Sequence, residues 1–377
     1  MFVTAILKVI SLYSLIFYIR KCDWKNQIPL RALRIFKGLI LWNILIIARG
    51  VLNAKDYWDW RFLGLSSFFY FLIPYAMVIG IMFFSNAPFF RFAYKKAYVY
   101  ATVLIPFTFM GMFLYGKAVI SVWFYLLLSI YIPKRRRLLI FTTALLALVT
   151  CYEVRANVLR IIVALCLFSA YYFRRFIRIS YLKIVCFLLF ITPLIFLSLG
   201  VTGYYNIFQP FDEDEQFVIS EGGKESSNLI QDTRTGLYVE VLSSVMENKT
   251  LLFGGGATEK YKSDLFITID DGRGRYGAEV GFLNTLLYAG ILGVLLYFII
   301  LITACYYAIN YSNSFLSKML GVFIAFRWVL FFIEDITKYD LNFYFLWIAI
   351  GMCFSTQFRM QTDDDLKKWL LKNVARK

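Results

Sequence analysis

Long apolar runs, each of about the length that crosses a membrane, recur along nearly the whole chain. They lie near residues 2–19, 36–52, 64–84, 98–116, 118–133, 138–152, 157–173, 181–200, 280–308, 317–334 and 341–357. A helix that spans the hydrocarbon core needs roughly 20 residues, most of them apolar. The pattern therefore predicts an all-α fold, a polytopic bundle of about eleven transmembrane helices.

A single long polar segment, residues 201–279, interrupts this pattern. It contains 14 acidic and 7 basic side chains, whereas the rest of the chain contains 33 basic and 10 acidic ones. The chain thus divides into spans one to eight (1–200), the polar insert (201–279), spans nine to eleven (280–358) and a basic tail (359–377). Because irregular backbone is tolerated outside lipid, we expect binding or chemistry in the insert.

Basic side chains gather in the turns between alternate spans. The clusters are Arg20 to Arg34, Arg91 to Lys96, Lys134 to Arg137 and Arg174 to Arg178, and the basic tail falls on the same side. By the positive-inside rule that side is cytoplasmic, which places the insert and the N-terminus outside. In the tail, Leu366, Trp369, Leu370 and Val374 share one helical face opposite lysines, and we interpret this as an interfacial helix that tethers the tail to the membrane.

Composition excludes a soluble domain and narrows the chemistry. Hydrophobic residues make up 60% of the chain and the mean hydropathy is +0.66. This is far from the amino-acid composition of soluble globular domains. Histidine is absent and the six cysteines show no metal-like spacing, so no metal ion or other cofactor is expected. Topology and anionic lipid account for the basic excess, and without a recognition motif nucleic acid is not expected as a partner.

The insert contains one predicted amphipathic helix followed by a glycine turn. After Asp232, the apolar side chains of Leu237, Tyr238, Val241, Leu242, Val245 and Met246 fall on one helical face. Arg234 stands at the start of this helix, where backbone amides and a guanidinium can together hold a phosphate oxygen. The turn Leu251–Leu–Phe–Gly–Gly–Gly lets the backbone approach a neighbour closely, and Arg273 and Arg275 follow before the chain re-enters the membrane.

The order of these motifs resembles the O-antigen polymerase and ligase superfamily of bacterial envelopes. Arg234 and Tyr238, the glycine turn, and then Leu283, Leu286, Gly290 and Gly293 entering a span fit the family's order and spacing, and Arg155 matches an arginine found before an earlier span. At the re-entry, where the family has His-Asn, this chain has Glu279 and Val280.

The resemblance implies an inverting, metal-independent glycosyltransferase of the bacterial inner membrane. Its donor would be an undecaprenyl-diphosphate-linked glycan, which it would polymerise into O-antigen or capsular polysaccharide at the outer face. Membrane lipid, a chain-length regulator and a flippase would be its partners. Five arginines on the outer side suit a diphosphate leaving group: Arg155, Arg160, Arg234, Arg273 and Arg275. A ligase to lipid A-core, a polysaccharide flippase or transporter, and a non-catalytic assembly partner remain alternatives.

The carboxylates supply candidates for a general base, because no histidine is available. Glu279 occupies the position of the family's histidine and is the favoured base, with Glu153 and Glu334 as rivals. An ion pair between Glu279 and a nearby arginine is an equal alternative. Arg327 lies in an apolar stretch two helical turns before Glu334, which indicates either a buried ion pair or a contact to diphosphate or glycan. Tyr238 is a further candidate substrate contact, and the aromatic run Tyr57–Trp58–Asp59–Trp60 suits either sugar stacking or an interfacial belt.

Overall fold

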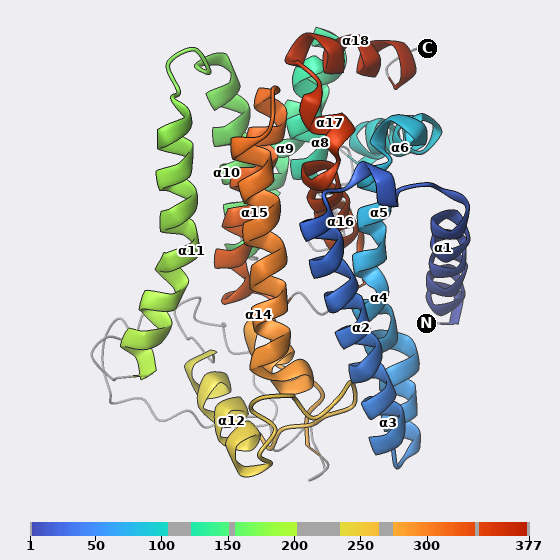
Figure 1. The fold of residues 1–377 in the computed structure, drawn as a ribbon, viewed down its shortest axis with the longest axis vertical. Coiled ribbons are helices and arrows are strands. Elements are labelled where there is room, and N and C mark those ends of the chain that lie inside the picture. The colour runs from blue at the N-terminus through green and yellow to red at the C-terminus, as the bar shows by residue number, and fades with distance from the viewer. Residues whose placement is uncertain are drawn as a thin grey trace.

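The computed structural model describes residues 2–104, 122–150, 155–201, 234–263, 274–335 and 339–374. Within these residues the chain is helical, and its one β-bridge joins Tyr261 to Arg275. The predicted all-α class is confirmed. Figure 1 shows long helices that run side by side along the long axis of the molecule.

The helices follow the apolar pattern of the sequence. In chain order they are α1 (Phe2–Lys21), α2 (Leu30–Asn53), α3 (Tyr57–Phe62), α4 (Phe68–Leu72), α5 (Met77–Ile81), α6 (Ala87–Leu104), α8 (Val122–Leu128), α9 (Lys134–Thr150), α10 (Arg155–Tyr172), α11 (Ile179–Val201), α12 (Arg234–Glu247), α14 (Gly281–Asn310), α15 (Phe315–Phe331), α16 (Leu341–Phe354), α17 (Thr356–Met360) and α18 (Asp363–Asn373). A helix overlaps each of the eleven runs named above.

Among the described residues, four stretches are long and apolar enough to cross a membrane. They are Leu30–Asn53, Tyr57–Ile81, Ile179–Leu199 and Gly281–Asn310. Shorter apolar helices include Ala156–Tyr172 and Leu341–Phe354. These helices indicate a membrane protein, while the number of spans remains a prediction.

The two ends of the bundle carry different parts of the sequence. In Figure 1, α6, α18 and the turn between α10 and α11 lie at the upper end, and α3 and α12 lie at the lower end. The basic turns are thus at the upper end, and the described part of the insert is at the lower end. The positive-inside rule places the basic turns and the acidic insert on opposite sides of a membrane, and the two lie at opposite ends of the bundle.

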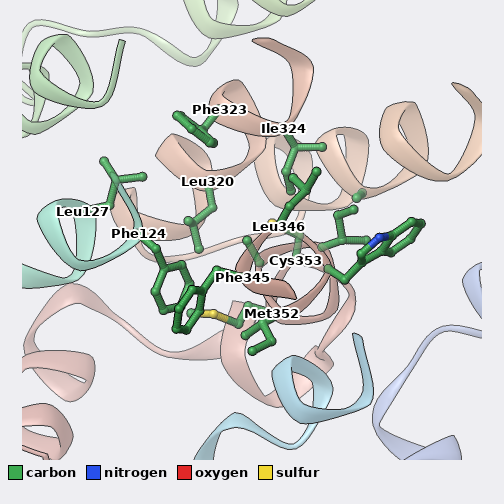
Figure 2. Close-up of a cluster of buried hydrophobic side chains, with 14 of the residues drawn as sticks. Phe124, Leu127, Leu320, Phe323, Ile324, Phe345, Leu346, Met352 and Cys353 are labelled. Atoms are coloured by element: carbon green, nitrogen blue, oxygen red, sulfur yellow. The ribbon is translucent and has the colours of Figure 1, made fainter. Parts of the chain in front are cut away.

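Close helix packing holds the bundle together. At the crossing of α5 and α16, a Cβ added at Gly80 would lie 1.9 Å from the Ile348 carbonyl oxygen, and one added at Gly351 would lie 1.9 Å from that of Met77. Figure 2 shows the neighbouring apolar cluster formed by α8, α15 and α16, in which Phe124 stacks on Phe345 with ring centroids 4.7 Å apart. Because lipid is as apolar as this core, such packing is what favours association inside a membrane.

The C-terminal helix α18 is docked on the bundle. Leu366, Leu370 and Val374 are buried in the main core, and Trp369 packs against Phe83 with ring centroids 4.7 Å apart. The face interpreted above as a membrane tether is therefore occupied by protein. That interpretation was wrong because periodicity identifies an apolar face but not what covers it.

Candidate functional site

Helix α14 is broken near its start, at Gly290. The backbone there has φ 68° and ψ −172°, which is not helical, and the hydrogen bonds of the following turn go outside the helix. The amide of Ile291 donates to the carbonyl of Leu251 at 2.9 Å, and that of Leu292 donates to Leu252 at 3.2 Å. The glycine turn of the insert therefore satisfies the amides that the break releases.

The same turn also donates hydrogen bonds to the carbonyls on the other side of the break. The amides of Gly255 and Gly256 donate to Leu287 and Tyr288 at 2.9 and 3.0 Å. A Cβ at Gly254 would lie 2.3 Å from the Tyr288 carbonyl oxygen. The close approach expected of the glycine turn is confirmed, and the structure identifies its partner as the break in α14.

Residues 251–258, which we call the strap, also bind α2 and the π-helical turn Leu63–Ser67 that precedes α4. The Ala257 amide donates to the Ile46 carbonyl at 3.1 Å, and the Ser67 hydroxyl donates to the Ala257 carbonyl at 2.8 Å. The strap thus fixes the first part of α14 (281–289) against the bundle. That short segment begins beside the turn at the end of α15.

At the lower end of the bundle, α12 and the start of α14 contact the turn 332–335 that follows α15. We call this meeting point the junction. The hydroxyl of Tyr238 on α12 donates to the Phe332 carbonyl at 3.0 Å. The amide of Gly281, at the start of α14, donates to the Glu334 carbonyl at 2.8 Å. Tyr238 therefore holds the insert to this turn, and the predicted amphipathic helix packs its apolar face inward, with Leu237, Val241 and Val245 fully buried.

Three charged side chains meet inside this junction. Arg160 of α10 and Arg327 of α15 flank Glu334, and their exposed fractions are 3%, 1% and 9%. Arg160 donates to one carboxylate oxygen of Glu334, and Arg327 Nη2 lies 2.7 Å from the other. The buried ion pair expected of Arg327 and Glu334 is present, and Arg160 joins it.

The arginines keep donors beyond those that face Glu334. Among the described residues, Nε and Nη1 of both Arg160 and Arg327 have no hydrogen-bond partner. The guanidinium of Arg327 also lies 5.2 Å from the centroid of the Phe343 ring. Buried charged donors are costly unless they are paired. Two guanidiniums with such donors form a site whose chemistry matches a phosphate group.

Glu279 lies at the solvent-exposed edge of the junction. Its side chain is 62% exposed, and its carboxylate is 3.8 Å from Nη2 of Arg275. This is the loose ion pair that the sequence left open. Glu279 stands two residues before Gly281 and so remains next to the turn that carries Glu334.

Several predicted residues are described only in part or not at all. Arg155 and Arg234 are the first residues of α10 and α12, and their side chains lie outside the described part. Arg273 and Glu153 lie outside the described residues. The structure therefore brings together Arg160, Arg327, Glu334 and Tyr238 out of the predicted set.

Sequence reasoning missed two polar residues of the junction, Asn284 and Asp335. The Asn284 side chain, 1% exposed, donates to the Asp335 carboxylate at 3.0 Å and to the Ala278 carbonyl at 2.7 Å. An asparagine inside the apolar run that enters the membrane was the available signal.

A third missed group, Glu259, directly follows the strap. Asn248 donates to its carboxylate at 3.1 Å. Burial raises the pKa of Glu259 above its ordinary value, against the opposite effects of the Asn248 hydrogen bond and the nearby Arg49 charge. Nothing in the sequence distinguishes this glutamate from those of a solvated loop.

The aromatic run of α3 surrounds a buried carboxylate. Asp59 accepts from Lys260 at 2.8 Å and from the Tyr276 hydroxyl at 2.5 Å, so it joins α3 to the insert. Trp58 and Trp60 are 44% and 51% exposed. Both uses considered for these rings, sugar stacking and an interfacial belt, need such exposure.

No family model, curated protein or solved structure matches this chain.

Proposed function

We propose that this protein is a polytopic inner-membrane glycosyltransferase that polymerises undecaprenyl-diphosphate-linked repeat units into O-antigen or capsular polysaccharide at the outer face. The observation that carries the proposal is the pair of buried arginines, Arg160 and Arg327, around Glu334. They lie at the end of the bundle that carries the insert, where the motif order resembling the polymerase superfamily is also found.

The chemistry of the reaction explains why such a pair is useful. When the bond to the anomeric carbon breaks, negative charge develops on the departing lipid diphosphate. Fixed cations in a water-poor site stabilise that charge without reorganising, because they are already oriented. Glu334 orients both guanidiniums, and their remaining Nε and Nη1 donors are available to phosphate oxygens.

The proposal includes a topology of eleven spans, with the insert outside and the basic turns in the cytoplasm. Lys262 of the insert is 88% exposed, and Lys368 is exposed on α18 at the other end. A cysteine at position 262, in a chain without its native cysteines, should react with an impermeant maleimide in intact spheroplasts. A cysteine at position 368 should react only after lysis. The reverse pattern would refute the topology and the outer-face chemistry.

Purified protein supplied with a lipid-diphosphate-linked repeat unit tests the activity directly. Arg160→Lys and Arg327→Lys keep the charge but lose the planar fork, and each should slow chain extension on the order of 100-fold. Arg174→Lys is the matched control, because Arg174 pairs with Asp363 at the opposite end and is 39% exposed. Chain extension that is insensitive to both changes at the junction would refute the role of the pair.

A gene deletion separates this function from its alternatives. Loss of a polymerase leaves single repeat units on the cell surface where long chains were. Loss of a ligase leaves no glycan on lipid A-core, and loss of a flippase stalls lipid-linked repeats on the cytoplasmic side. A non-catalytic assembly partner would leave the purified protein without chain-extending activity.

One observation favours a flippase or transporter as the second candidate. Helix α14 is broken at Gly290, and the span Tyr57–Ile81 is interrupted by a π-helix at Leu63–Ser67 and a 3-10 turn at Ile73–Ala76. Broken helices are typical of transporter binding sites. Transfer of a labelled lipid-linked repeat across vesicles that contain the pure protein, without chain extension, would support this candidate over the polymerase.

A further inference from the structure

A groove with a volume of about 480 Å³ lies at the end of the bundle that carries the basic turns. This volume is typical of sites for small ligands, which measure about 300–1,000 Å³. Most of its lining comes from α17, α18 and the residue that joins them, and the polar part consists of Gln357, Gln361, Asp365, Lys368, Lys372 and Asn373. Figure 1 shows α18 at the opposite end from α12, so the groove is separate from the junction.

Hydrogen bonds place these two helices at the level where the long helices end. Just after α14, Asn313 donates from its backbone to the Arg359 carbonyl and from its side chain to the Met360 carbonyl, both at 2.8 Å. The Phe315 amide, at the start of α15, donates to the Asp363 carboxylate at 2.9 Å. Because α14 is long and apolar enough to cross a membrane, the groove lies where lipid headgroups begin.

Two lysines of α18 line the groove one helical turn apart. Lys368 and Lys372 are both exposed, and like charges four residues apart on a helix repel each other. The acid of the same lining, Asp365, accepts from the Thr362 hydroxyl at 2.7 Å at the start of its own helix. An anion between the two lysines would relieve their repulsion. The charges therefore favour a negatively charged ligand.

The rest of the lining suits the uncharged parts of a phospholipid. Trp369 packs against Phe84 with ring centroids 5.1 Å apart, which gives the groove an aromatic wall. Tryptophan is enriched where a membrane meets water, because its ring is apolar and its N–H is polar. The side-chain amides of Gln357, Gln361 and Asn373 can donate to phosphate oxygens and accept from headgroup hydroxyls.

We propose that this groove binds the headgroup of an anionic, glycerol-type phospholipid of the surrounding membrane. Lys368 and Lys372 hold the phosphate, and the neighbouring amides hold the glycerol hydroxyls. Basic pockets at the ends of spanning helices bind such headgroups in membrane proteins. The site gives α18 a contact with lipid although its apolar face is buried in protein. It requires only that the helices lie in a membrane, and it is independent of the proposed glycosyl transfer.

Lipid titration of the purified full-length protein in neutral micelles tests the site, with bound lipid counted by native mass spectrometry. Wild-type protein should bind short-chain phosphatidylglycerol at least about tenfold more tightly than phosphatidylcholine of the same chain length. Lys368→Gln and Lys372→Gln should each weaken phosphatidylglycerol binding about fivefold, as expected for one lysine at a lipid headgroup.

Lys367→Gln is the matched control. It removes the same charge from the same helix, at an exposed position outside the lining, and should change the affinity less than about twofold. An equal loss in all three lysine variants would indicate a diffuse positive surface and overturn the proposal. Equal affinity of the wild-type protein for the two lipids would overturn it as well.

Soluble glycerol phosphate distinguishes a lipid from a free phosphate ligand. It carries the same charged group without acyl chains, so it should not displace phosphatidylglycerol at an equal concentration. Displacement at an equal concentration, lost in Lys368→Gln but not in Lys367→Gln, would assign the groove to a soluble phosphate compound and refute the lipid.

Discussion

The contact between the strap and the broken helix can be tested with one methyl group. At Gly290, φ is 68° and ψ is −172°, a region of backbone conformation that is essentially restricted to glycine, so another residue there costs about 1–3 kcal/mol. A Cβ would also lie 2.4 Å from the Leu252 carbonyl oxygen. The strap must then move away from the helix.

Moving the strap affects the two hydrogen bonds it accepts from Ile291 and Leu292. A buried donor that loses its partner costs about 1–3 kcal/mol. Together with the backbone strain, the loss of one of these bonds should make Gly290→Ala lower the free energy of unfolding by about 2–6 kcal/mol. Gly38→Ala in α2 is the control, because nothing lies within 4 Å of the added Cβ. It should raise the free energy by about 0.5–1 kcal/mol, the usual gain of replacing glycine in a helix.

Equilibrium unfolding in mixed micelles, followed by circular dichroism, measures both variants. Gly254→Ala should also destabilise, because its Cβ would lie 2.3 Å from the Tyr288 carbonyl oxygen. Both glycines lie at the same contact between the strap and α14. The double variant should therefore lose less free energy of unfolding than the sum of the two single variants. If Gly290→Ala unfolds with a free energy within about 1 kcal/mol of that of Gly38→Ala, the strap does not hold α14 in place.

Three further expectations use the same unfolding assay. Gly80→Ala and Gly351→Ala each place a Cβ 1.9 Å from a carbonyl oxygen of the facing helix and should cost about 1–3 kcal/mol; stability equal to that of Gly38→Ala would contradict the close crossing. Glu334→Gln leaves two buried guanidiniums without a counter-charge and should cost about 3–5 kcal/mol, whereas Glu279→Gln at an exposed pair should cost under about 1 kcal/mol; equal costs would contradict the burial argument. Burial raises the pKa of Glu259 in the folded protein, so this carboxyl favours the fold most at acidic pH and loses that contribution as pH rises through its folded-state pKa. The stability gained by Glu259→Gln should thus be larger near pH 8 than at about pH 4.5, and a gain independent of pH would exclude the assignment.

The order of helices, the polar insert and the charge asymmetry were all readable from sequence. Each depends on local composition, such as the apolar run 280–308 that became α14 or the lysine-rich tail that became α18. The amphipathic face of α12 was also predictable, since Leu237, Val241 and Val245 recur with the helical period. What covers each face was not predictable, as the docked α18 demonstrates.

The candidate site depended on contacts between distant parts of the chain. Arg160 and Glu334 are 174 residues apart, and no spacing rule relates them, so only the packing of α10 against α15 brings them together. For Arg327 and Glu334 the separation of two helical turns did suggest the pair. Asn284 in its apolar run was a usable signal, but nothing in the sequence relates it to Asp335, which is 51 residues away, until the fold joins them.

Sequence by itself determined that this chain forms apolar helices with one acidic insert, because hydrophobic burial and charge placement follow from residues taken a few at a time. It also indicated that the glycine turn of the strap permits close approach to a neighbour. Only the tertiary structure decided that these two glycine motifs contact each other and that two buried arginines share one glutamate. The physical reason is that backbone hydrogen bonds at a helix break, and ion pairs between helices, form between whichever residues the whole packing brings within about 3 Å.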